Sequence, residues 1–252
     1  MLTNNDLAFL SGNYLPFPEA GLNIYQPKIK EIAFIGEEAF YTGLELLNFS
    51  KNNLTEEDKV NLDGMTNFDV LIAILKERNA VMQKNRNCVM MVLALIFPEY
   101  KITLEDGIVL KNTNEEVFKI DNSNFEKFKD ILNTMFMFKQ EKEKEYNPVG
   151  ELSKRIADKL KKRQQKLNET KSQKKIDILS RYVSILATSQ SIDINILLNY
   201  TVYQLQDVFV RTQLKMGYDI YLQAKMAGAK DLKEVEDWMK DIHSDVDADQ
   251  SF

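Results

Sequence analysis

The residue types that most often carry catalysis are scarce in this chain of 252 residues. His243 is its one histidine and Cys88 its one cysteine. His243 stands beside an acidic stretch, and Cys88 falls inside an apolar run without a neighbouring base. Nucleophilic catalysis needs a nucleophile, a base and a group that orients the base. We therefore predict a surface histidine, a buried cysteine and no enzymatic activity.

Motifs for phosphate groups and metal ions are also missing. The chain has no Gly-rich loop that ends in Gly-Lys-Ser/Thr and no Gly-rich dinucleotide turn. Asp245, Asp247 and Asp249 alternate like the start of a calcium loop, but the glycine and final glutamate of such a loop are absent. A single cysteine excludes an intramolecular disulfide and a cysteine-rich zinc site. We expect no cofactor and no bound metal.

The sequence predicts a mainly α-helical fold with a small inserted β-meander. Apolar residues make up 44% of the chain, and 9 Gly and 5 Pro leave room for long helices. Prolines predict an irregular arm over the first 27 residues. Alternation around an Asp106-Gly107 turn predicts a small antiparallel β-meander over residues 101–120. Apolar spacing and caps predict the helices of this half, at residues 29–49, around 68–75, at 81–97 and at 125–138.

A break near residue 146 divides the chain. Charges alternate before it, and Tyr146-Asn147-Pro148 interrupts the helical pattern. We predict an N-terminal helical domain with the β-meander, residues 1–145, and a C-terminal helical region, residues 146–252. The helices expected in the second part are 153–171, 175–188, 194–198, 202–227, which Gly228 ends, and 231–242.

The C-terminal region contains one strongly basic helix. Residues 151–175 carry ten Lys/Arg against three Asp/Glu, a net +7, whereas residues 231–252 carry a net −6. Such a helix can be a solvated face, pair with an acidic helix, track phosphates or lie on an anionic membrane. It lacks the aromatic residues typical of nucleic-acid and membrane sites, which favours a solvated face or helix pairing and leaves nucleic acid as an alternative. Its candidate residues are Lys154, Arg155, Lys159, Lys161, Lys162, Arg163 and Lys166.

A second candidate surface is aromatic. Its positions suit a packed helical hairpin, but aromatic residues with arginine are also typical of protein interfaces. The candidate partner-binding residues are Tyr200, Tyr203, Phe209, Arg211, Tyr218, Tyr221 and Trp238.

The last 50 residues resemble a known family. The resemblance rests on Leu198-Asn199-Tyr200-Thr201-Val202-Tyr203-Gln204-Leu205, on Gly217-Tyr218-Asp219 and on Ala224-Lys225-Met226-Ala227-Gly228-Ala229. It ends with Val235-Glu236-Asp237-Trp238-Met239-Lys240-Asp241-Ile242-His243. These runs are similar to tail assembly chaperones of tailed phages of Gram-positive bacteria.

The resemblance implies a non-catalytic protein in the host cytoplasm. Such a chaperone binds the tape measure protein, and the tail tube protein is a further candidate partner. A tape measure protein is a very long helix whose apolar stripes would aggregate unless covered. The alternative is a structural protein retained in the virion at the tail, neck or baseplate. Self-association is possible in either case. The longest apolar run, at residues 89–97, is about half of the ~18–20 residues that a membrane span needs, so we expect no membrane insertion.

Overall fold

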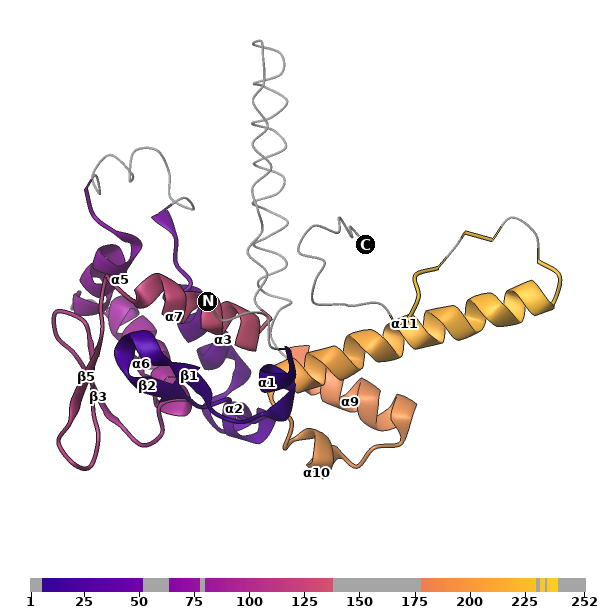
Figure 1. Ribbon diagram of the computed structural model, residues 1–252, viewed down its shortest axis with the longest axis horizontal. Helices are drawn as coiled ribbons and strands as arrows, with labels where there is room; N and C mark the ends of the chain where they lie inside the picture. Colours follow the sequence, from indigo (N-terminus) through magenta and orange to yellow (C-terminus); the bar gives the residue numbers. More distant parts are fainter. Residues whose placement is uncertain are drawn as a thin grey trace, which may run out of the picture.

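The fold is mainly helical and contains two small antiparallel sheets (Figure 1). The computed structural model describes residues 6–51, 64–77, 80–137, 178–229, 232–233 and 235–239. The predicted fold class, mainly α with an inserted β-meander, is confirmed. The break near residue 146, the basic helix and the acidic stretch after residue 245 lie outside the described residues.

The first 27 residues were expected to be irregular, and this prediction is wrong. They form α1 (Asp6–Ser11), β1 (Leu15–Phe17), the short 3-10 helix η1 (Pro18–Ala20) and β2 (Leu22–Ile24). Leu15 pairs with Ile24 and Phe17 with Leu22, and all four side chains are buried. Prolines disfavour a long helix here, but they are tolerated in edge strands and at the first position of a helix. Strands of three residues are too short for their alternation to be recognised in the sequence.

The helix predicted over residues 29–49 is divided by Gly36. α2 (Ile29–Ile35) and α3 (Glu37–Leu47) meet at this glycine, whose φ is 87°. A positive φ is not helical, and glycine adopts it without steric cost. The apolar spacing continues through the break because both helices face the same core.

α3 packs closely on the long buried helix α6. α5 (Asn67–Lys76) and α6 (Ala80–Ile96) follow α3, and α6 agrees with the predicted buried helix. A Cβ atom on Gly43 of α3 would lie 2.5 Å from the carbonyl oxygen of Cys88 on α6. The two backbones therefore approach closely, and Cys88 is buried, as predicted.

The β-meander lies where the sequence predicted it. β3 (Lys101–Leu104), β4 (Ile108–Lys111) and β5 (Val117–Ile120) pair in sequence order. The sheet buries Ile108, Leu110 and Ile120 against the helices. α7 (Phe125–Met135) follows at once and contributes a row of buried apolar residues to the same core.

The C-terminal helices are α9 (Ile178–Gln190), α10 (Ile194–Leu197) and α11 (Val202–Met226). Thr201 caps α11, because its hydroxyl accepts a hydrogen bond from the Gln204 amide at 3.2 Å. Gln204 in turn accepts one from the Thr201 amide at 2.9 Å, which completes a capping box. No helix in the described parts of the chain is long and apolar enough to span a bilayer.

The short helix predicted over residues 231–242 is not found in the residues of this stretch that the structure describes. Residues 232–233 and 235–237 have no regular secondary structure, and residues 238–239 form a turn. Leu232, Val235 and Met239 are exposed there. A short helix depends on packing of its apolar face, and these side chains have no core to pack against.

The two halves of the chain share one hydrophobic core. Buried residues from β1 to α7 and from α9 to α11 belong to a single cluster. The amide of Ile29 donates to the carbonyl of Tyr200 at 2.9 Å, and the amide of Lys30 donates to Leu198 at 3.0 Å. The carboxylate of Glu37 accepts from the first amides of α9, that of Leu179 at 3.1 Å and that of Ser180 at 2.9 Å. The N-terminal elements therefore hold α9 and α11 in place.

Candidate protein-binding site

The residues that could carry catalysis do not form a reactive centre in the described structure. Cys88 is 5% exposed, and burial raises the pKa of its thiol, which disfavours the nucleophilic thiolate. His243 lies outside the described residues. Among the described residues, no three His, Cys, Asp or Glu side chains come together to hold a metal ion.

A surface depression of about 530 Å³ between α5 and the β-meander contains charged residues that pair with one another. The amide of Asn122 donates to Asp69 at 2.7 Å, and Lys76 pairs with Asp106 at 3.1 Å. The hydrogen bond from Asn122 holds the pKa of Asp69 below its usual value. These contacts join α5 to the β3–β4 turn and to the residues after β5, so we assign them a structural role.

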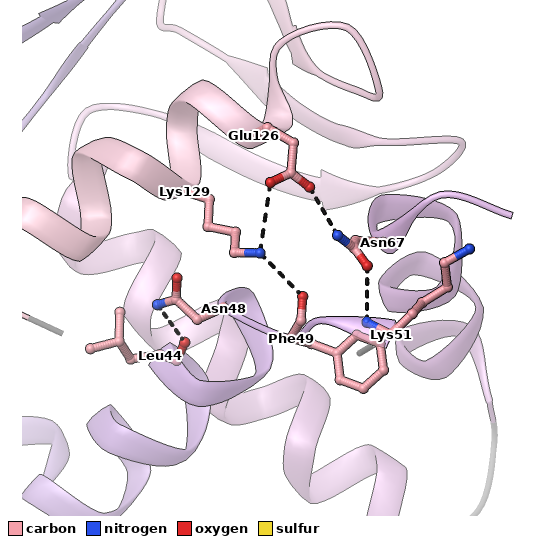
Figure 2. Close-up of polar contacts among 7 residues, drawn as sticks. All are labelled: Leu44, Asn48, Phe49, Lys51, Asn67, Glu126 and Lys129. Carbon is pink, nitrogen blue, oxygen red and sulfur yellow. Dashed lines mark hydrogen bonds and ion pairs between the residues drawn. The ribbon is translucent and has the colours of Figure 1, made fainter. Parts of the chain in front are cut away.

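A polar network around the buried Lys129 joins α7, α5 and the residues after α3 (Figure 2). Lys129 is 4% exposed, and its ammonium lies 3.5 Å from the carbonyl oxygen of Phe49 and 3.7 Å from the Glu126 carboxylate. Glu126 accepts a hydrogen bond from the side chain of Asn67, which accepts one from the Lys51 amide. Lys51 also donates to the carbonyl of Met65, so these contacts attach the segment after α3 to α5 and α7, which again indicates a structural role.

Two of the aromatic candidates lie in the core. Tyr203 is 1% exposed and stacks on Phe9 of α1 at 5.3 Å between ring centroids. Phe209 is 8% exposed and stacks on Tyr182 of α9 at 4.0 Å. These rings attach α11 to the rest of the fold, so their surfaces are already covered.

Two further candidates, Tyr200 just before α11 and Arg211 within it, are half-buried. Tyr200 packs against the core, and its carbonyl accepts the hydrogen bond from Ile29. Nε of Arg211 lies 3.3 Å from both carboxylate oxygens of the buried Asp207. This contact within α11 fixes the arginine, although its side chain is still 37% exposed.

The other three aromatic candidates, Tyr218, Tyr221 and Trp238, are half-buried and do not belong to the core cluster. The ammonium of Lys225 lies 5.8 Å from the centre of the Tyr221 ring, within cation–π range. Their use by a partner protein stays a prediction. The candidate residues of the basic helix, between Lys154 and Lys166, lie outside the described residues, so nucleic-acid binding also stays a prediction.

The structure adds a surface that the aromatic pattern did not reveal. α11 extends well beyond α9 and the other described helices (Figure 1). Four large apolar side chains on this outer half are exposed, and we call it the α11 arm. They are Met216 at 51%, Ile220 at 64%, Leu222 at 38% and Met226 at 88%.

The α11 arm continues a buried helical face. Met216 and Ile220 follow the buried Phe209 by seven and eleven residues, so all three lie on the same side of the helix. The side of α11 that packs on α9 at Phe209 therefore stays apolar in the outer half of the helix, where no described helix covers it. The spacing can be read from the sequence, but it does not show where α9 ends along α11, so the exposed part of the face could not be predicted.

Comparison with known proteins connects this part of the chain to phages. Residues 170–243 match a family described as the YomV second domain, a phage-derived family named for a protein of a Bacillus phage region. The matched residues include all of α9, α10 and α11. Neither the curated proteins nor the solved structures include one that matches the chain.

Proposed function

We propose that this chain is a non-catalytic phage tail assembly chaperone that covers an apolar helical face of the tape measure protein with its α11 arm. The single observation that carries the proposal is the exposure of the apolar α11 arm beyond the folded body. The phage-derived family match, which includes the whole of α11, supports the phage context.

The contact surface suits a helical partner. A helix that binds in a groove or along another helix uses apolar anchors at spacings of three, four and seven residues. Met216 and Ile220 are four residues apart and lie on the same side of α11 as Phe209, which α9 covers, so a partner helix would occupy this face beyond the end of α9. Methionine adapts its shape to different neighbours, which suits a long partner whose apolar stripe varies along its length.

Burial of the exposed side chains supplies the binding energy. Each Met or Ile side chain that leaves water contributes about 1.5–3 kcal/mol. Met216 and Ile220 are 51% and 64% exposed, so only part of this energy is gained, and loss of both should weaken binding by about 10-fold or more. Burial of the apolar stripe of the tape measure protein in the same contact adds to the binding free energy.

The test is co-expression with the tape measure protein of the same genome. We expect the wild-type chain to raise the soluble fraction of that protein and to co-purify with it. The double variant Met216→Asn/Ile220→Asn should lose both effects while keeping its fold, since both side chains are exposed.

A matched control changes two apolar residues elsewhere on the surface. Phe34 is 91% exposed on α2 and Val81 is 67% exposed on α6. Phe34→Asn/Val81→Asn should behave like the wild type. The proposal fails if the wild-type chain leaves the solubility of the tape measure protein unchanged, or if both double variants are equally active.

Analysis of purified virions separates the proposal from its main alternative. A chaperone leaves before the particle is complete, so mass spectrometry of mature virions should detect the tape measure protein without this chain. Detection of the chain in stoichiometric amount would instead indicate a structural protein of the virion.

A further inference from the structure

A second surface depression, of about 300 Å³, lies away from the α11 arm and combines aromatic rings with a carboxylate. We call it the Tyr14–Glu99 depression. Tyr14 comes from the connection between α1 and β1, and Glu99 from the connection between α6 and β3. The lining residues are Tyr14, Asn23, Phe97, Pro98, Glu99 and Tyr100.

The aromatic rings at this place form two pairs. Tyr14 lies 5.3 Å from Tyr25, and Phe97 lies 6.1 Å from Tyr100. Phe97 is fully buried, and Tyr14 is 48% exposed. Buried ring packing therefore fixes one side of the depression, while the Tyr14 ring stays open to solvent.

The electrostatics of the depression are negative. The hydroxyl of Tyr14 donates to the Glu99 carboxylate at 3.3 Å, and that of Tyr25 donates to Glu31 at 3.2 Å. Burial, followed by the charge of Glu99 and its hydrogen bond, raises the pKa of the Tyr14 hydroxyl, and the charge of Glu31 acts in the same direction. Within the described residues, neither glutamate forms an ion pair with a lysine or arginine.

We propose that the Tyr14–Glu99 depression binds the guanidinium group of an arginine side chain presented by a partner polypeptide. A guanidinium stacks on aromatic rings and also donates in-plane hydrogen bonds to a carboxylate. The depression offers both contacts, and among the described residues no lysine or arginine forms an ion pair with its carboxylate. Its volume is at the lower end of ligand pockets, which suits one side chain and not a whole cofactor.

A peptide arginine is favoured over the free amino acid. Free arginine is zwitterionic at its α-carbon, and its α-ammonium and α-carboxylate would lose hydration at the depression, which costs free energy. An arginine within a polypeptide has no charge at this position. The site is independent of the α11 arm, so it would exist whether or not the chain is a chaperone.

The experiment is a titration of the full chain with N-acetyl-arginine methylamide, followed by the aromatic NMR signals of Tyr14 and Tyr100. We expect saturable shifts that weaken as salt is added. The citrulline analogue, which has the same shape but no charge, should cause no saturable shift. Free arginine should bind more weakly than the capped compound.

Variants locate the site. Glu99→Gln keeps an acceptor for the Tyr14 hydroxyl but removes the charge, and it should weaken binding by about 3- to 10-fold. Glu105→Gln removes an exposed charge from the β3–β4 turn and should leave the affinity unchanged. Absence of saturable shifts, equal binding of the citrulline analogue, tighter binding of free arginine, or equal effects of the two variants would each overturn the proposal.

Discussion

Two helical glycines differ in what surrounds them, and this difference predicts opposite effects of the same substitution. A Cβ atom on Gly43 would lie 2.5 Å from the carbonyl oxygen of Cys88, whereas one on Gly217 would meet nothing within 4 Å. Gly43→Ala should therefore lower the free energy of unfolding by about 1–3 kcal/mol, because the two backbones must move apart. Gly217→Ala should raise it by about 0.5–1 kcal/mol through helix propensity.

Urea denaturation followed by circular dichroism measures both effects, with each variant as the control for the other. A neutral Gly43→Ala variant would mean that α3 and α6 are farther apart than described. A destabilising Gly217→Ala variant would mean that the surface of α11 around Gly217 is covered.

Tyr25 should titrate well above a normal tyrosine. Burial and the neighbouring Glu31 carboxylate raise the pKa of its hydroxyl to about 12. A tyrosine in the unfolded chain has a pKa near 10. The folded state therefore retains this proton more strongly, so the contribution of Tyr25 to stability is complete below pH ~10 and is lost as the pH rises toward 12.

The ultraviolet phenolate absorbance of the wild type, minus that of Tyr25→Phe, isolates this group. We expect the difference to titrate near pH 12. A difference that titrates near 10 would place Tyr25 in solvent, away from Glu31.

At the scale of elements, α11 depends on its N-terminal cap. Thr201 is 2% exposed, and its hydroxyl satisfies the Gln204 amide at the point where α11 starts from the body. Loss of a threonine cap costs about 1–2 kcal/mol. We expect Thr201→Ala to lower the melting temperature by several degrees, as measured by calorimetry.

Thr188 offers a matched control. Its hydroxyl donates to the Ser184 carbonyl within the exposed part of α9, a bond that a helix does not need. Thr188→Ala should leave the melting temperature almost unchanged. If both variants lowered the melting temperature equally, the stabilising role of the Thr201 cap would be contradicted.

Sequence patterns located most elements because local rules determine them. Helical spacing identified α6 and α7, and an Asp-Gly turn between alternating residues identified β3 and β4. The division at Gly36 and the β1–β2 hairpin were missed. The apolar spacing continues through the break at Gly36, and strands of three residues are too short to show alternation.

At the scale of the molecule, the shared core predicts that both halves unfold together. Leu44 of α3 and Leu186 of α9 are fully buried in the same cluster. Each leucine-to-alanine change should cost about 2–5 kcal/mol through the cavity that it leaves. We expect both variants to shift one common unfolding transition to lower urea.

Far-ultraviolet and near-ultraviolet circular dichroism should follow this transition with the same midpoint. Two separate transitions, of which Leu186→Ala shifts only the later part of the chain, would instead support independent domains at residues 1–145 and 146–252.

The candidate site could be predicted from the sequence only in part. The aromatic residues of α11 could be identified from the sequence, but their separation into core and surface could not. Tyr203 and Phe209 pack on α1 and α9, whereas Met216 and Ile220 lie past the end of their neighbours. Which part of an apolar face is covered depends on the position of another helix.

The sequence by itself determined the mainly helical class, the β-meander, the scarcity of catalytic residue types and the resemblance to phage proteins. These properties follow from residue identity and from spacing along one segment. Only the tertiary structure decided that both halves share a core and that the outer half of α11 lies beyond it. It also brought Tyr14 and Glu99 together across 85 positions. Burial and contact depend on which distant segments meet, and a single segment does not encode that.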